Sequence, residues 1–285
     1  MIVPQSLGMA QPEMMQNEEI SVVFEKPLMS AAREVVRIYP AVKKELENLF
    51  GWRFNIRPQV ILVKDNQNFN KMTRNDLFVA FAIADKNLIV IDYSRMNVRP
   101  FTLGVTLKHE LCHLLLHHQI RNSNLPRWLN EGVCQWVSDG IGEIYPDKSR
   151  SALDAAVISG RMLSLQGLTD NFPENTASLM LAYEQSKSVV AYIERQYGKG
   201  TIIDILYHLR NGDSMETASM KSLSATVGQM EKEWLDQLER TPRWMIFLAN
   251  NLYGILFFLA ALLTFFGFIR LVKRKKAYRD WGDDE

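Results

Sequence analysis

Residues 109–113 read HELCH, a stretch with two histidines and a glutamate between them. His109 and His113 stand four positions apart, which places them on one face of a helix, one turn from each other. Both imidazoles then reach one zinc ion, and the intervening Glu110 reaches a water molecule bound to that ion. The surrounding window 102–118 has the apolar spacing of a helix and holds four of the chain's five histidines. The pattern therefore predicts a metal site on a helix.

A second motif follows downstream, where residues 126–132 read PRWLNEG. Seventeen residues separate His113 from Glu131. The pair of motifs resembles the gluzincin zinc metallopeptidases, and WLNEG is similar to the string found in their aminopeptidase members. The resemblance implies that Glu131 is the third ligand of one zinc ion per chain, beside His109 and His113. It also implies that Trp128 packs near the site.

Other zinc-binding patterns fit this stretch less well. The metzincin pattern requires a glycine at position 116 and a histidine at position 119, where the chain has Leu116 and Gln119. His117 lies one turn beyond His113, and on a straight helix its side chain points along the axis, away from a tetrahedral site. A packing or helix-end histidine is the better interpretation of His117.

Three further side chains lie close to the ligands in the sequence. Cys112 and Cys134 are expected to be small buried residues and not ligands, because thiolates are typical of structural zinc sites. A disulfide between them stays open, since sequence spacing does not reveal the distance between two cysteines. Gln135, one turn after Glu131, either hydrogen-bonds a ligand histidine or lies on the surface.

The helix expected over residues 178–197 carries a second resemblance. The chain reads YEQS at 183–186 and YG at 197–198, as in the compact peptidase-MA-like proteins of the minigluzincin type, and the likeness covers about residues 75–210. It implies that Tyr183 donates a hydrogen bond to the oxyanion, with a packing tyrosine as the alternative. The GxMEN segment with which aminopeptidases capture a free amino terminus does not precede the first motif. The sequence therefore favours an endopeptidase.

Composition narrows the class of protein. Of the 285 residues, 47% are apolar and 23% are charged, which is close to a soluble globular average and excludes a disordered, collagen-like or multi-span membrane protein. The 33 Lys and Arg residues balance 32 Asp and Glu residues, so the chain has no basic surplus for binding nucleic acid. Two cysteines cannot form a disulfide framework.

The spacing of apolar residues predicts an α+β fold. A small mixed sheet with one long helix is expected in the first hundred residues, followed by a helical half that carries the metal site. The predicted strands are 20–24, 59–63, 78–84 and 88–92, the last two forming a hairpin around Asp85-Lys86-Asn87; the predicted helices are 30–49 with Ser30 as N-cap and Gly51 at its end, 102–118, one following Pro126, 178–197 ending at Gly198 and Gly200, 201–209 and 224–238.

One segment has the composition of a single membrane span. Residues 244–269 carry no charge, and a helix of about 20 apolar residues crosses a membrane. The tail 270–285 begins with basic residues and ends acidic, which predicts a cytoplasmic C-terminus under the positive-inside rule. The domain 11–240, with a sheet part 11–100 and a helical part 101–240, is then expected outside the cytoplasm, in a periplasmic or extracellular position. A tail-anchored protein whose domain stays in the cytoplasm is the alternative.

Residues 1–10, which read MIVPQSLGMA, resemble the end of a signal peptide. Gly8 and Ala10 are small residues at the −3 and −1 positions of a cut before Gln11. An ordinary disordered tail is the alternative.

These features predict a membrane-anchored zinc-dependent peptidase that acts on peptide or protein substrates, with Glu110 as the general base. A zinc-stabilised, non-catalytic membrane-anchored binding or assembly module is the alternative, and Glu110 argues against it because a structural site does not need this residue. Hydrolysis of a non-peptide amide or ester also stays open. The strands expected over 78–84 and 88–92 are both candidates for binding the substrate backbone by strand addition.

Overall fold

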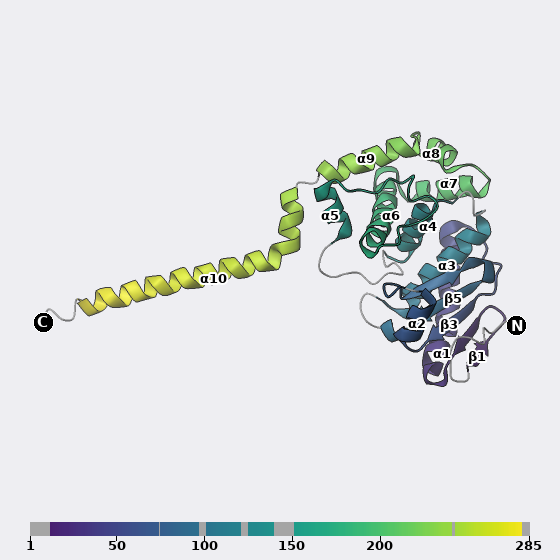
Figure 1. Ribbon diagram of the computed structural model, residues 1–285, viewed down its shortest axis with the longest axis horizontal. Coiled ribbons are helices and arrows are strands. Elements are labelled where there is room, and N and C mark those ends of the chain that lie inside the picture. Colours follow the sequence, from purple (N-terminus) through teal and green to yellow (C-terminus); the bar gives the residue numbers. More distant parts are fainter. Residues whose placement is uncertain are drawn as a thin grey trace. The chain divides into compact units, whose positions relative to one another are not determined.

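The computed structural model describes residues 12–73, 75–96, 101–120, 125–139, 151–240 and 243–280. Within the last range, side chains are described for residues 251–271 only. The chain divides into two compact units, Met1–Leu235 and Asp236–Glu285 (Figure 1). The first unit holds the sheet and the helices that surround the predicted metal site.

The first unit begins with a five-stranded mixed sheet whose strand order is β1-β2-β3-β5-β4. The three inner strands run parallel, and each outer strand pairs antiparallel with its neighbour. The predicted α+β class and the predicted hairpin are therefore confirmed. The strands are β1 (Glu13–Gln16), β2 (Ser21–Phe24), β3 (Gln59–Val63), β4 (Ala80–Ile83) and β5 (Leu88–Asp92).

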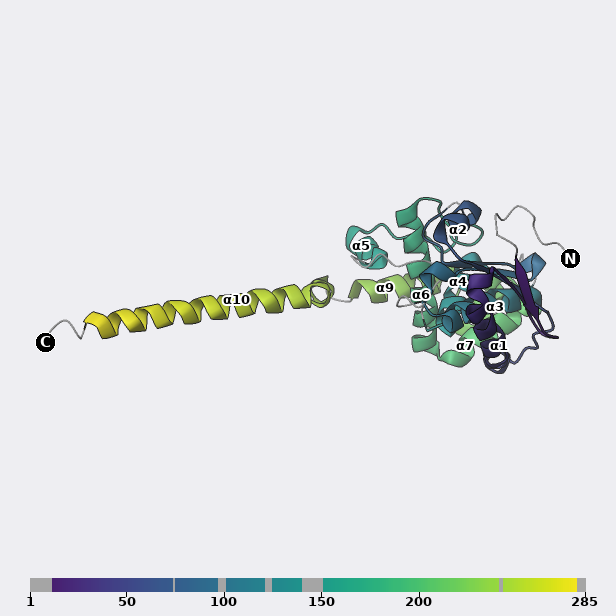
Figure 2. The same ribbon diagram turned by 90° about the horizontal axis from the view of Figure 1, so that it is seen from below.

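The three inner strands of the sheet, β2, β3 and β5, are buried on both faces because they are runs of apolar residues. Along one row of the register, Val23, Ile61 and Val90 lie side by side and pack with Phe69 of α2 (Asn66–Thr73). The alternate row belongs to the opposite face, on which α1 (Met29–Phe50) and α3 (Leu103–Gln119) pack against each other and against the strands. Figure 2 shows α2 on one side of the sheet and α1 and α3 on the other.

The helical half of the unit is built around the contact between α4 and α6. The two helices cross so closely at Gly132 that a Cβ atom there would meet the backbone carbonyl of Ser186 and would lie 2.6 Å from Cγ2 of Val190. No residue larger than glycine fits at this crossing without a shift of α6. The helices are α4 (Arg127–Val137), α5 (Ala152–Ser159), α6 (Thr176–Tyr197), α7 (Lys199–Arg210), α8 (Met215–Leu223) and α9 (Val227–Arg240).

The structure corrects three local expectations. Ser30 lies inside the first turn of α1, whose N-cap is Leu28 without a side-chain hydrogen bond. Gly200 lies inside α7, whereas Gly198 does end α6. The helix expected over 224–238 is preceded by a separate helix, α8, whose N-cap Ser214 accepts a hydrogen bond from the Thr217 amide and whose C-cap Ser224 has a left-handed backbone. Strand β1 and helices α2 and α5 were not expected from the sequence.

Unit 236–285 contains the long helix α10 (Arg243–Asp280), which includes the segment 244–269. Its stretch Asn251–Leu271 has 21 residues with a mean hydropathy of 2.4, and none of it is buried. The helix is therefore long and apolar enough to span a membrane. The expected signal remnant at residues 1–10 lies outside the described residues.

Substituting Gly132 with alanine should destabilise the first unit. The added methyl group overlaps the α6 backbone, and overpacking of this kind costs about 1–3 kcal/mol. Thermal unfolding of the full chain in detergent, followed by circular dichroism, measures the change. Gly200→Ala in α7 is the control, because no atom lies near its would-be Cβ and alanine favours a helix. An equal midpoint for Gly132→Ala and the wild type would contradict the close crossing.

Candidate metal centre

Helix α3 places the two motif histidines in the interior of the molecule. It begins after Thr102, whose side-chain oxygen accepts a hydrogen bond from the Val105 amide and so caps the helix. Because His109 and His113 are four residues apart, they lie one above the other on the helix, with Glu110 beside them. His109 is 1% exposed and Glu110 is 0% exposed. Polar side chains buried to this degree need partners.

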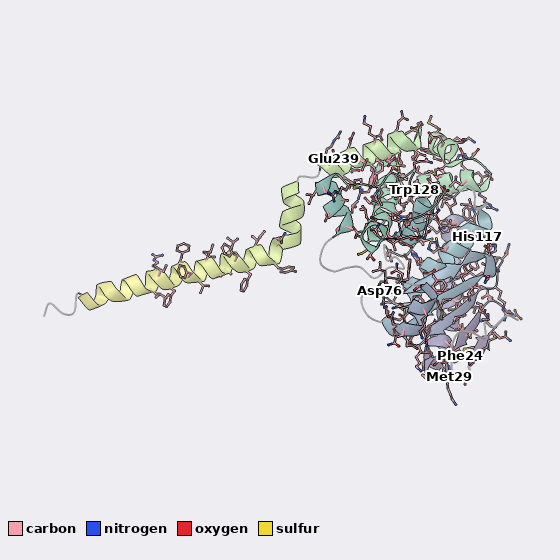
Figure 3. The ribbon with its side chains drawn as sticks, viewed as in Figure 1. Phe24, Met29, Asp76, His117, Trp128 and Glu239 are labelled. Carbon is pink, nitrogen blue, oxygen red and sulfur yellow. The ribbon has the colours of Figure 1, made fainter. Side chains whose placement is uncertain are left out.

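Helix α4 carries Glu131 toward these histidines. Its first amides would be left unsatisfied at a bare helix end, but the carbonyl of Thr169 accepts from Arg127 N at 2.7 Å and the carbonyl of Leu168 accepts from Trp128 N at 3.1 Å. Trp128 is fully buried within the helical half (Figure 3), as expected. The start of α4 and its crossing at Gly132 together determine where Glu131 lies.

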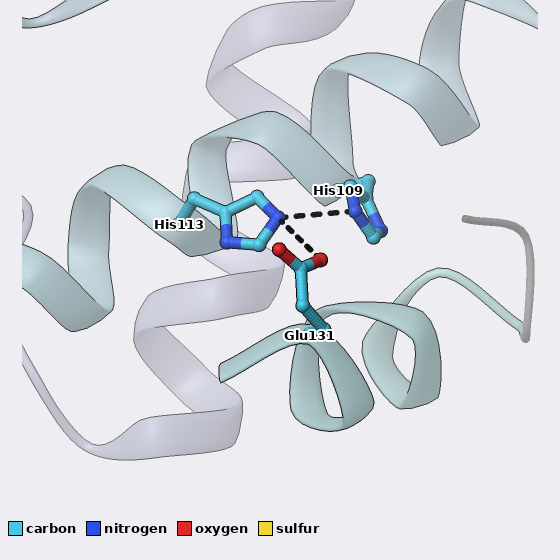
Figure 4. Close-up of side chains that lie close together, drawn as sticks. All are labelled: His109, His113 and Glu131. Atoms are coloured by element: carbon cyan, nitrogen blue, oxygen red, sulfur yellow. Dashed lines mark hydrogen bonds and ion pairs between the residues drawn. The ribbon is translucent and has the colours of Figure 1, made fainter. Parts of the chain in front are cut away.

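His109, His113 and Glu131 converge on one point (Figure 4). One ligand atom from each residue lies within 4.8 Å of the other two. The two Nε2 atoms are 3.1 Å apart, and Nε2 of His113 is 3.5 Å from Oε2 of Glu131. Two imidazoles and one carboxylate are the ligand set of a catalytic zinc site with one open position.

The tautomer of His113 is determined by its neighbour on α4. Its Nδ1 lies 2.9 Å from Oδ1 of Asn130, a side-chain carbonyl that only accepts hydrogen bonds. Nδ1 therefore carries the proton in the neutral ring, and Nε2 presents its lone pair to Glu131 and His109. This is the orientation that a metal ligand requires.

Ser138 determines the tautomer of His109 in the same way. Its Nδ1 lies 3.2 Å from Oγ of Ser138, and that hydroxyl donates its one proton to the carbonyl of Cys134 at 2.7 Å. The Ser138 oxygen must then accept from Nδ1 of His109, which leaves the Nε2 lone pair facing the centre. Two lone pairs 3.1 Å apart repel each other unless a cation lies between them.

Burial of the carboxylate adds to this demand for positive charge. Burial raises the pKa of Glu131 to about 7, and the charge of Arg127 partly opposes the shift. Oε2 of Glu131 is buried without a hydrogen-bond partner among the described residues. A divalent cation at the centre satisfies this oxygen and both nitrogens, so the residues present fit zinc.

The two cysteines take no part in the cluster. Cys112 and Cys134 are fully buried and free, as the small-residue interpretation expected, and no disulfide joins them. Sγ of Cys134 lies 3.3 Å from Nδ1 of His113, on the side of the ring away from the centre. Burial raises the pKa of the Cys134 thiol well above its usual value, so the sulfur is a neutral thiol and a poor metal ligand.

A cavity of about 870 Å³ opens onto this centre. Of the predicted site residues, His113 and Glu131 line it, while Glu110 and Tyr183 are buried. Tyr183 is 4% exposed and its ring meets the ring of Phe172 edge to face, with the centroids 5.1 Å apart. The backbone carbonyl of Tyr183 accepts a hydrogen bond from Gln135, which lies one turn after Glu131 on α4.

Two residues near the ligands have different roles from those considered in the sequence. His117 belongs to the helix end, as expected, and its Nε2 lies 3.0 Å from Oδ1 of Asp85. Gln135 is buried and donates to the carbonyl of Tyr183, so neither alternative for this residue describes its contact. Asn130 and Ser138 are the residues that hold the ligand histidines, and sequence reasoning missed both. The signal for Asn130 was its place within WLNEG, immediately before Glu131.

The sequence profile of the Peptidase MA superfamily matches residues 70–240 of the chain. Among solved structures, the chain is similar to a mutant M1 zinc metallopeptidase from Deinococcus radiodurans, with 12% identity, a TM-score of 0.43, and coverage of 79% of this chain and 52% of that one. It is also similar to native leukotriene A4 hydrolase from Saccharomyces cerevisiae, with 14% identity, a TM-score of 0.43, and coverage of 79% of this chain and 37% of that one. The chain thus spans about half the length of these structures or less. No curated protein matches it.

Removing either histidine partner should weaken metal binding without abolishing it. Ser138→Ala and Asn130→Ala each free a ligand ring to rotate or change tautomer, and losses of this kind reduce metal affinity by about 10- to 100-fold. Competition with a chromophoric zinc chelator measures the affinity. Ser159→Ala is the matched control, because Ser159 makes the same hydrogen bond to a carbonyl four residues earlier on an exposed surface. Unchanged zinc affinity in both variants would show that these contacts do not orient the rings.

Proposed function

This chain belongs to the peptidase MA superfamily, and we propose that it is a membrane-anchored zinc-dependent peptidase, acting as an endopeptidase. His109, His113 and Glu131 are its proposed ligands for one zinc ion. The observation that carries this proposal is the convergence of three ligand atoms. The Nε2 atoms of both histidines and the Glu131 carboxylate face one buried point, and the Nδ1 atom of each ring has a partner of its own. A cavity large enough for several peptide residues adjoins that point.

The chemistry assigns one role to each buried residue of the centre. When bound there, zinc would lower the pKa of a coordinated water and polarise the scissile carbonyl. Glu110, placed between the two histidines of α3, takes the proton of the attacking water and delivers it to the leaving nitrogen. The phenol of Tyr183 donates a hydrogen bond to the developing oxyanion. Its packing on Phe172 fixes the direction of the ring.

The edge strand β4 is the proposed binding site for the substrate backbone. Strand β5 lies between β3 and β4, so only β4 of the two candidate strands has a free side. The carbonyl of Val79 accepts from the Asp92 amide on the β5 side, and by alternation the peptide groups of Ala80 and Ala82 face away from β5. Ala82 lines the cavity. An extended peptide added here would run beside the proposed zinc ligands.

We further propose that α10 anchors the enzyme. The domain 11–240 would then be attached through the span 244–269 to a short cytoplasmic tail, 270–285. The apolar stretch Asn251–Leu271 supports the anchor, and the basic residues that follow it support the orientation.

Glu110→Gln should retain zinc and lose peptidase activity. The amide is nearly isosteric with the carboxylate but accepts no proton, and loss of a general base lowers the rate by about 10²–10⁴-fold. Cleavage of a random peptide library, read by mass spectrometry, measures turnover, and elemental analysis measures zinc. Equal activity in both proteins would assign the base to another residue. Normal zinc content with no cleavage by either protein would favour a binding module.

The catalytic domain should lie outside the cytoplasm. In sealed spheroplasts, external protease should then remove an epitope placed after Gln11 and leave one placed after Glu285 intact. A protected epitope at Gln11 combined with a digested one at Glu285 would reverse the orientation. A cytosolic marker protein that stays intact is the control for sealed membranes.

A further inference from the structure

One cation in the cavity has no role in the proposed chemistry. Arg127 is the first residue of α4 and lines the cavity together with His113 and Glu131. It stands four positions before Glu131, so the two side chains are neighbours on one helix face, with Cβ atoms about 5–6 Å apart. A positive group therefore lies one helix turn from a proposed metal ligand.

The guanidinium of Arg127 packs on an aromatic ring. Its central carbon lies over the ring of Phe172, 4.9 Å from the centroid, and Phe172 is only 8% exposed. The backbone amide of Arg127 is fixed as well, by its hydrogen bond to Thr169. A guanidinium packed on an aromatic face still has its N–H donors, and these match the two oxygens of a carboxylate.

In the part of the chain that the structure describes, no carboxylate pairs with this fork. Among the described residues Arg127 forms no ion pair. Three carboxylates line the cavity. Glu131 lies against His113, Glu216 is exposed and accepts from the Val227 amide, and Asp170 is exposed. The guanidinium is partly buried, and its neighbour Glu131 is turned toward His113, which makes Arg127 a ready site for an anionic group of a bound molecule.

We infer that Arg127 binds a carboxylate of the peptide substrate and so selects peptides that carry one next to the scissile bond. This inference rests on the proposed function. Neighbours one helix turn apart, at about 5–6 Å, and a rise of about 3.3 Å per extended residue place that carboxylate within about two residues of the scissile bond. Its source is an Asp or Glu side chain, which suits internal cleavage, or the C-terminal α-carboxylate, which suits release of short C-terminal fragments.

Peptide binding to the zinc-loaded full chain tests the inference without turnover. The Glu110→Gln variant is equilibrated in detergent with each of four hexapeptide libraries. The bound peptides are then quantified by mass spectrometry. One library has a free C-terminal carboxylate and no Asp or Glu. The second is its C-terminal amide. The third is amidated with one Glu at a varied position, and the fourth has Gln in its place.

Charge-assisted hydrogen bonds of this kind are worth about 10- to 100-fold in binding. We expect such a preference for the first library over the second if the partner is the α-carboxylate, or for the third over the fourth if it is an acidic side chain. Adding Arg127→Gln should bring the ratio close to one, and Arg127→Lys should retain part of it because the charge remains. Arg161→Gln removes an exposed arginine outside the cavity and should leave the ratio unchanged.

Binding without any carboxylate preference, or a preference that survives Arg127→Gln, would overturn the inference, as would the absence of peptide binding. Equal zinc content and unfolding midpoints in the Arg127 variants exclude a general loss of structure. Cleavage of the same libraries by the wild type is scored separately. If the wild type cleaves none of them while the binding ratios behave as expected, the proposed function fails and the role of Arg127 as a carboxylate-binding residue stands.

Discussion

The structure around the proposed metal centre depends on three buried ligand atoms whose lone pairs face one another. Two imidazole nitrogens and a carboxylate oxygen all face one point, and they repel one another unless positive charge lies between them. A fold that buries such a cluster must hold every contributor in place, because each is unstable there without its partners. Helix α3 supplies two of the donors, α4 supplies the third, and α6 packs against α4 and holds it in position.

Helix α4 serves several purposes over only a few turns, and each face of it has a different neighbour. Glu131 points to the centre, Asn130 holds the ring of His113, and Gly132 lets α6 approach. Ser138, just past the end of the helix, holds the ring of His109. The residues of α4 are therefore selected by contacts on three sides at once. This explains why a string as short as WLNEG is so informative about the site.

The sequence predicts most of the inner sheet, the hairpin and the two motif-bearing helices, because long apolar runs and helical spacing are local signals. Strand β1, which reads EMMQ, carries no such signal and exists through its pairing with β2. Helix α8 was missed because its exposed residues are mixed in type and two of its three buried ones, Ala218 and Ser219, are small. The histidine partners were missed for a different reason. Asn130 and Ser138 act across 17 and 29 residues of sequence, and only tertiary packing shows which ring nitrogen each one meets.

In the segment that precedes α6, Thr169 contacts both helix α4 and the cavity, and this links binding at the cavity to binding at the metal centre. Thr169 caps the first turn of α4 through its carbonyl, and it also lines the cavity. The cavity wall and the start of the helix that carries Glu131 therefore share this residue. Occupancy of the two places is linked through this contact, and linkage is reciprocal: whatever factor the metal contributes to the affinity for a peptide, the peptide contributes to the affinity for the metal. A peptide that tightens the hold on the metal would itself bind more tightly to the metal-loaded protein, and one that loosens it would bind less tightly.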